Sequence, residues 1–77
     1  MENLINRIVI NPKIMVGKPV IKGTRVTVQN ILELLGANET LEHILEAYPN
    51  LKAEDIRACI QFASRIVADE FYMPQTS

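Results

Sequence analysis

The sequence predicts a mainly α domain, in which a short N-terminal β ribbon precedes a three-helix helix-turn-helix unit of the homeodomain-like or winged-helix-like kind. Three observations support this class. Apolar residues recur at helical spacing from residue 27 onward, two β-prone stretches precede that point, and turn residues separate the segments. The 77 residues suffice for one small domain. We divide it into a β arm with a basic turn (7–26), a three-helix bundle (27–72) and a polar tail (73–77).

The β arm contains two stretches that favour extended backbone. Ile5 and residues 8–10 are β-formers, and the turn signal Asn11-Pro12 ends them. The pair Val20-Ile21 forms the second stretch, between a proline and a glycine. We expect the two to pair as an antiparallel ribbon, within one chain or between two chains. Because a lone two-stranded ribbon is marginal in water, it must pack on the helices.

Three helices are predicted after the arm. The first follows Thr27, a suitable N-cap, and ends near residues 36–38, where Gly36 or Asn38 can take a left-handed conformation. The second follows Thr40 and stops before Pro49, and the third runs from about residue 53 to residue 71. Their apolar stripes are Val28, Ile31, Leu32 and Leu35; Leu41, Ile44, Leu45 and Tyr48; and Ile56, Cys59, Ile60, Ala63, Ile66 and Val67.

Charge is distributed unevenly along a chain whose net charge is −1. Residues 1–30 carry five Lys or Arg against one Glu, whereas residues 31–77 carry three against eight Asp or Glu. This uneven charge indicates a basic face that binds an anion or an acidic partner. The alternative is that the basic N-terminal part of one chain attracts the acidic C-terminal part of another across a dimer. No apolar run is long enough for a membrane span and no signal peptide is visible, so we expect a soluble cytoplasmic protein without membrane contact.

The run 17–25 (GKPVIKGTR) is the densest feature of the chain. It does not form a phosphate-binding loop, because Pro12 stands where that motif needs its first glycine and Pro19 where it needs a hydroxyl. One histidine, His43, and one cysteine, Cys59, make no metal site, and the cysteine is expected to be a small buried residue. We therefore expect no enzyme, no cofactor and no metal.

Two interpretations of the run remain open. In the structural one, its glycines form turns, Thr24 or Thr27 serves as a cap, and Arg25 pairs with a carboxylate such as Glu33. In the functional one, Lys18, Lys22 and Arg25 contact phosphates or an acidic partner surface.

The chain resembles the bacterial domain of unknown function 433 family. The resemblance rests on Asn11-Pro12, on residues 17–28, on residues 48–51, and on Glu54-Asp55-Ile56 with the apolar positions that follow. It implies a usually dimeric helix-turn-helix domain similar to VapB-type antitoxins, whose genes often lie beside one for a PIN-like toxin ribonuclease. The chain would then be an antitoxin-like regulatory protein of a bacterial type II toxin-antitoxin system that binds a PIN-like toxin, with operator DNA open as a further partner.

In a helix-turn-helix, the first turn of the third helix here would meet DNA. That turn offers the cations Lys52 and Arg57, but the carboxylates of Glu54 and Asp55 would repel DNA phosphates. Acidic residues at this position are instead suited to the positive end of the helix dipole. Lys52 cannot cap the helix, and Asn50 is the candidate substitute. The candidate residues for binding nucleic acid or a partner are Lys18, Lys22, Thr24, Arg25, Lys52 and Arg57.

The alternative is a dimeric structural or protein-interaction module that binds no nucleic acid. The third helix carries more apolar residues than one side can bury, so we expect a homodimer that covers Phe62, Phe71, Tyr72 and Met73.

Overall fold

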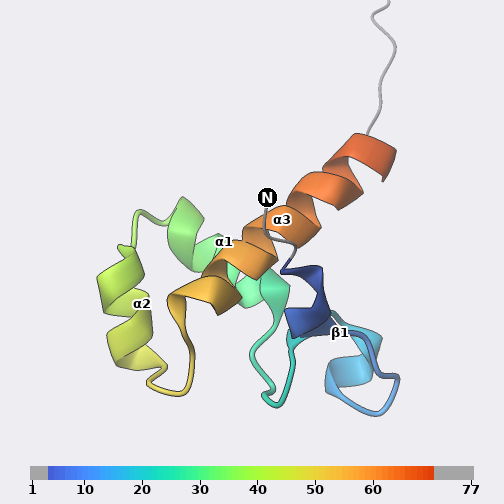
Figure 1. Cartoon of the computed structure of the whole chain (residues 1–77), viewed down its shortest axis with the longest axis horizontal. Coiled ribbons are helices and arrows are strands. Elements are labelled where there is room, and N and C mark those ends of the chain that lie inside the picture. Colours follow the sequence, from blue (N-terminus) through green and yellow to red (C-terminus); the bar gives the residue numbers. More distant parts are fainter. Residues whose placement is uncertain (1–3, 71–77) are drawn as a thin grey trace, which may run out of the picture.

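Three helices and a small hairpin make up the computed structural model, which describes residues 4–70 (Figure 1). In chain order the elements are the 3-10 helix η1 (Ile5–Arg7), strand β1 (Ile8–Val9), the short turn η2 (Met15–Gly17), strand β2 (Val20–Ile21), and helices α1 (Val28–Gly36), α2 (Leu41–Ala47) and α3 (Ala53–Glu70). The predicted mainly helical architecture with a short ribbon is confirmed. Phe71, Tyr72 and Met73 lie outside the described residues.

The hairpin forms within the chain. Strands β1 and β2 pair antiparallel, with Ile8 opposite Ile21 and Val9 opposite Val20. The ribbon is shorter than the β-prone stretch: residues 5–7 form η1 instead, and Ile10 lies beyond the strand with 61% of its surface exposed. Both residues of β2 are buried, at 0% and 2% exposure. Packing on the helices thus supplies the stability that a free ribbon lacks.

Polar side chains mark where the helices begin and end. The hydroxyl of Thr27 accepts a hydrogen bond from the N–H of Asn30, and the hydroxyl of Thr40 accepts one from the N–H of His43. The N-cap expected at Thr27 is therefore present, and Thr40 caps α2 in the same way. Asn38 takes the left-handed conformation (φ 71°) after α1, whereas Gly36 stays inside the helix.

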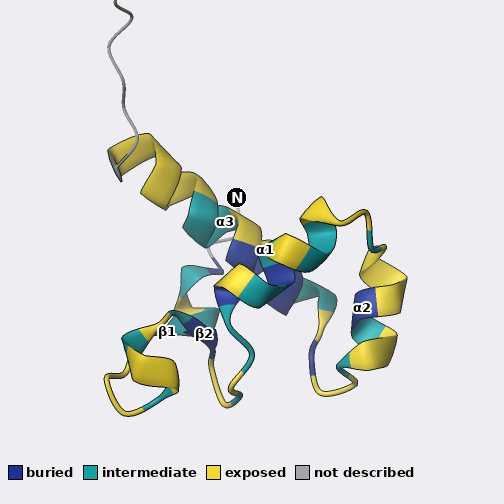
Figure 2. Ribbon diagram, turned by 180° about the vertical axis from the view of Figure 1, so that it is seen from behind, coloured by how far each residue is buried: buried dark blue, intermediate teal, exposed yellow. Residues whose placement is uncertain are grey.

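The core lies where the three helices meet β2 (Figure 2). Its members are buried aliphatic side chains and one thiol: Ile21, Val28, Ile31, Ile44, Leu51, Ile56 and Cys59. The expectation that Cys59 is buried is confirmed, at 0% exposure. Burial, together with the charge of nearby Asp55, raises the pKa of the Cys59 thiol to about 12, so the thiol stays protonated at neutral pH.

Helix α3 has two different halves. Its first half packs on the core, whereas residues 64–69 are all exposed and the helix extends beyond the body of the molecule (Figures 1 and 2). None of the helices in residues 4–70 is long and apolar enough to cross a bilayer.

Candidate binding surface

Three connecting segments meet at one edge of the molecule, at the bottom of Figure 1. They are residues 11–18 between the strands, residues 22–25 after β2, and residues 48–52 between α2 and α3; we call them together the loop edge. Lys18 and Arg25 line one shared hollow, and residues 23–26 line another, of about 530 Å³, with residues 47–51. Segments far apart in sequence thus form one continuous surface.

The loop edge carries only positive charge. Five of the eight Lys and Arg of the chain lie on it, and its three segments contain no Asp or Glu. These cations are Lys13, Lys18, Lys22, Arg25 and Lys52. All five are exposed, and none of their side chains forms an ion pair or hydrogen bond with a residue of the described range 4–70. The fold therefore leaves these charges available to an outside anion.

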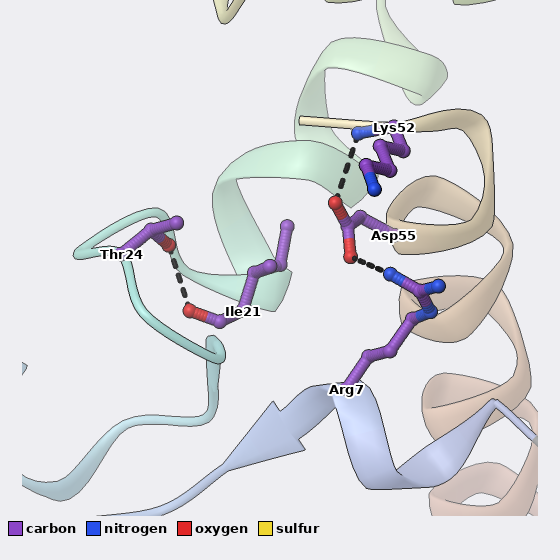
Figure 3. A network of polar contacts seen from close by, with 5 residues as sticks. All are labelled: Arg7, Ile21, Thr24, Lys52 and Asp55. Atoms are coloured by element: carbon purple, nitrogen blue, oxygen red, sulfur yellow. Dashed lines mark hydrogen bonds and ion pairs between the residues drawn. The ribbon is translucent and has the colours of Figure 1, made fainter. Parts of the chain in front are cut away.

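The turn over residues 22–25 has a fixed shape. Gly23 adopts φ 79°, which suits glycine because it has no Cβ. The hydroxyl of Thr24 donates to the carbonyl of Ile21 (Figure 3). It also accepts from the N–H of Val26. The hydroxyl of Thr24 is thus used within the chain, and its role is to hold Lys22 and Arg25 at the two ends of a rigid turn.

The segment 11–18 is held in an unusual conformation. The side chain of Asn11 accepts a hydrogen bond from the N–H of Lys13. Met15, Val16 and Gly17 then have φ of 49°, 57° and 79° in succession. A left-handed backbone is strained for a β-branched residue, and Val16 is nevertheless 93% exposed. Within the described residues, burial of the Val16 side chain therefore does not offset this strain.

Arg25 does not form the ion pair with Glu33 that the structural interpretation of the sequence suggested. Its expected partner Glu33 accepts a hydrogen bond from the amide of Gln29 instead. Arg25 and Glu33 line the same hollow without forming an ion pair. The Arg25–Glu33 pair, the example of carboxylate pairing expected in the structural interpretation, is therefore absent from the described residues.

Asp55 is a structural residue that the sequence reasoning missed. One carboxylate oxygen accepts from the guanidinium of Arg7 at 3.0 Å and the other from the N–H of Lys52 at 2.9 Å (Figure 3). Asp55 is 7% exposed. We call Arg7, Lys52 N–H and Asp55 the anchor, because it joins η1 to the start of α3.

The anchor corrects two expectations about α3. Asp55 accepts a hydrogen bond from the backbone N–H of Lys52, three residues earlier, in the manner of the acidic half of a capping box, whereas no hydrogen bond to the side chain of Asn50 is present among the described residues. Asp55 also points inward to a cation, so it does not oppose phosphate at the surface. The spacing of three residues between Lys52 and Asp55 was the available signal.

Four of the six predicted binding residues share the loop edge as exposed cations: Lys18, Lys22, Arg25 and Lys52. Thr24 lies there as the residue that shapes the turn. Arg57 is exposed on α3, outside the loop edge. Among the side chains that the structure describes, no three His, Cys, Asp or Glu gather as metal ligands. The imidazole of His43, on the exposed face of α2, pairs with the carboxylate of Glu39 just before that helix.

The fold and its basic edge define a structural class: a small, mainly helical domain with an N-terminal hairpin and an edge rich in Lys and Arg. The chain belongs to the family described as "Protein of unknown function (DUF433)", which matches residues 8–63. It is 42% identical over 53 residues to the uncharacterized protein y4eO of Sinorhizobium fredii (strain NBRC 101917 / NGR234), covering 69% of this chain and 24% of that protein. The chain thus spans about a quarter of that curated relative.

A solved structure shares the fold. The crystal structure of a DUF433 member from Anabaena variabilis ATCC 29413 superimposes with a TM-score of 0.75 at 28% identity, covering 78% of this chain and 59% of that one. The family resemblance seen in the sequence is therefore confirmed.

Proposed function

We propose that the chain is an antitoxin-like regulatory protein whose loop edge contacts the phosphate backbone of operator DNA and whose folded body binds a PIN-like toxin. The observation that carries the DNA contact is the set of five exposed cations with no acid among them. Lys and Arg side chains that neutralise phosphates release counterions, which supplies most of the affinity of such contacts. The role is one of binding, with no catalysis.

The arrangement of α2 and α3 supports the same proposal. A helix at residues 41–47, a connection at 48–52 and a longer helix from residue 53 have the order of a helix-turn-helix. Lys52 lies at the start of the second of these helices and Arg57 one turn later, both exposed, while Asp55 is buried against Arg7. The start of α3 therefore presents less negative charge than its sequence indicates, and it adjoins the other loop-edge cations.

The salt dependence of DNA binding tests the contact. Binding to the DNA upstream of the chain's own gene is measured over a range of salt for the native chain and for the triple variant Lys18→Ala, Lys22→Ala, Arg25→Ala. Losing three phosphate contacts reduces the slope of log K against log salt by about 3. The matched control is Lys18→Arg, Lys22→Arg, Arg25→Lys, which keeps every charge and should keep the slope. An unchanged slope in the alanine variant contradicts the proposal.

Toxin binding rests on the family resemblance and has its own test. The chain is co-expressed with the product of the adjacent gene and purified through a tag on that product. The expected result is a stable complex whose ribonuclease activity is lower than that of the product alone. If the two do not co-purify, or if the activity is unchanged, the antitoxin role is wrong.

A dimeric interaction module without nucleic acid is the second candidate. An apolar hollow of about 470 Å³ between α1 and the C-terminal half of α3 favours it, because such surfaces are covered by protein partners. Self-association without any DNA binding at low salt would select this candidate.

A further inference from the structure

The segment 11–18 exposes two apolar side chains at the end of the loop edge that lies farthest from α2 (Figures 1 and 2). Val16 is 93% exposed and Met15 is 40% exposed. We call these two residues the tip. Both have left-handed backbone, with φ of 57° and 49°, which is strained for residues that carry a Cβ. Strain of this kind persists where the fold presents a side chain for a function, so the tip is a candidate contact residue pair.

Hydrogen bonds within the segment hold the tip in place. The N–H groups of residues 14, 17 and 18 each donate to the carbonyl three residues earlier, with N···O distances of 2.9, 3.0 and 3.1 Å. The side chain of Asn11 accepts a further hydrogen bond from the N–H of Lys13. The side chain of Val16 is itself stiff, because a β-branched residue has restricted rotation about χ1. The tip is therefore a preorganised apolar projection, which loses little conformational freedom when it binds.

Cations surround the tip. Lys13 precedes it in the chain and Lys18 follows it, and both are exposed. Arg25 lines a hollow with Met15 and Lys18, in which the acidic residue is Glu33 of α1. An apolar projection among cations suits a partner that is anionic at its surface and apolar inside.

Duplex DNA has this arrangement, because phosphates border its grooves and stacked bases fill its interior. An anionic lipid surface has it too, but the affinity of a protein for lipid scales with the apolar area that it buries. The tip provides only two apolar side chains, one of them 40% exposed. The cations of the loop edge continue on both sides of it, as contacts along a phosphate backbone require. The observations therefore favour DNA.

We infer that the tip is an apolar wedge, which enters the minor groove of DNA at the loop edge and partly unstacks one base step. This inference rests on the proposed DNA contact and adds to it the groove and the residues that deform the duplex. Lys13 and Lys18 bind phosphates beside the step, and Val16 enters between the base pairs. Wedges of this kind kink a duplex by about 20–90° toward the major groove. Pyrimidine–purine steps, which unstack most easily, are the preferred sites.

Deformation of the duplex is measured separately from affinity. Energy transfer between dyes at the ends of a duplex of about 30 base pairs, taken from the DNA upstream of the gene, reports bending. The fluorescence of 2-aminopurine at successive adenines reports unstacking. The full native chain should bring the ends closer and raise the fluorescence at one step.

Variants of the tip separate the wedge from the phosphate contacts. Val16→Asn keeps the left-handed backbone, so the chain should fold, but the bend and the fluorescence rise should be lost. Its affinity should fall about tenfold, because an apolar side chain no longer leaves water. The slope of log K against log salt should stay unchanged, since no charge is removed. Val16→Leu should keep the bend, and the matched control Ile10→Asn should change none of these readouts.

Inosine·cytosine pairs in place of A·T identify the groove, because they keep the minor-groove face of A·T and change the major-groove face. The native chain should bend this duplex as well; loss of the bend would place the tip in the major groove and overturn the inference. Salt-dependent binding without bending or unstacking overturns the inference and leaves the proposed DNA contact standing. A native chain that does not bind DNA overturns both. Binding to phosphatidylserine vesicles that Val16→Asn abolishes, with no bending of DNA, would assign the tip to a lipid surface and also overturn the inference.

Discussion

Arg7 and Arg25 belong to the same N-terminal arm and have opposite surroundings. The guanidinium of Arg7 bonds to a carboxylate that is 10% exposed, whereas the guanidinium of Arg25 has no ion-pair partner among the described residues. The difference follows from what lies opposite each one. Arg7 faces the start of α3, where Asp55 is buried and needs a cation. Arg25 shares a hollow with Glu33, but Glu33 is exposed and accepts a hydrogen bond from Gln29 instead. The same guanidinium group thus stabilises the fold at Arg7, in the anchor, and has no partner among the described residues at Arg25, on the loop edge.

The anchor also shows why Asp55 cannot simply be a surface acid at a helix start. A buried carboxylate loses hydration that only charged or hydrogen-bonding partners restore. Arg7 and the Lys52 N–H provide those partners, and in return the carboxylate satisfies the N–H of the residue that precedes α3. At the loop edge the cations stay in water, so nothing in the fold depends on them.

Removing the anchor should give the largest effect at neutral pH. Asp55→Ala leaves the Lys52 N–H without its acceptor and Arg7 without its partner, so we expect a loss of about 2–3 kcal/mol in the free energy of unfolding. The value lies at the low end for buried pairs because the Arg7 side chain is 38% exposed. Urea denaturation measures it. The control Glu54→Ala, in the same helical turn, should cost about 0.5 kcal/mol or less. Equal losses would contradict a special role for Asp55.

The sequence predicted the local parts of this structure and missed the long-range ones. The caps at Thr27 and Thr40 and the left-handed Asn38 depend on residues within one turn, so their chemistry is visible in the chain itself. The Arg7–Asp55 pair joins residues 48 positions apart, and the hydrogen bond from the Leu4 N–H to the Gln61 side chain joins residues 57 apart. No periodicity encodes such pairs, because they exist only once the arm is packed on α3.

The same division between local and long-range features holds for the candidate site. Lys18, Lys22 and Arg25 stand out as a dense run, and Gly23 indicates the turn that separates them. Lys52 was predicted from its place at the start of the third helix, and Lys13 was not predicted. The structure adds that both lie at the same edge as the run, because the fold brings the segments 11–18 and 48–52 together there. The wrong pairing of Arg25 with Glu33 had a similar cause: the spacing allowed a contact that the side chains do not make.

The next effect should come from the buried thiol of Cys59, as a dependence of the free energy of unfolding on pH. The pKa of Cys59 is 9.0 unperturbed and about 12 in the folded chain. Above pH 9 the unfolded chain loses this proton while the folded chain keeps it, so the unfolded state binds fewer protons and stability falls as pH rises. The expected loss is up to about 1.4 kcal/mol per pH unit between these pKa values, with none below the lower one. Denaturation of the native chain and Cys59→Ala across this range isolates the contribution, because lysines and tyrosines titrate in both; equal pH slopes would contradict it.

Relieving the strain at the loop edge should give a smaller change of opposite sign. Val16→Asn keeps the left-handed backbone with a residue that tolerates it, so we expect a gain of about 1 kcal/mol in the free energy of unfolding. The matched control is Ile10→Asn, an exposed aliphatic residue outside the left-handed run, which should change stability little. Thermal and urea denaturation report both. A stability loss in Val16→Asn would show that the valine side chain contributes to the fold.

The smallest effect should come from the loop-edge cations. The triple variant Lys18→Ala, Lys22→Ala, Arg25→Ala removes three exposed charges that have no partner among the described residues, so its free energy of unfolding should stay within about 0.5 kcal/mol of the native value. Any change should be a slight gain that disappears at high salt, because the neighbouring cations repel one another. Arg7→Ala, which removes a single cation, should cost about 2 kcal/mol in the same measurement because it strands the buried Asp55 carboxylate. If the triple variant lost as much as Arg7→Ala, the loop-edge charges would be part of the fold, and the division between the two arginines would not hold.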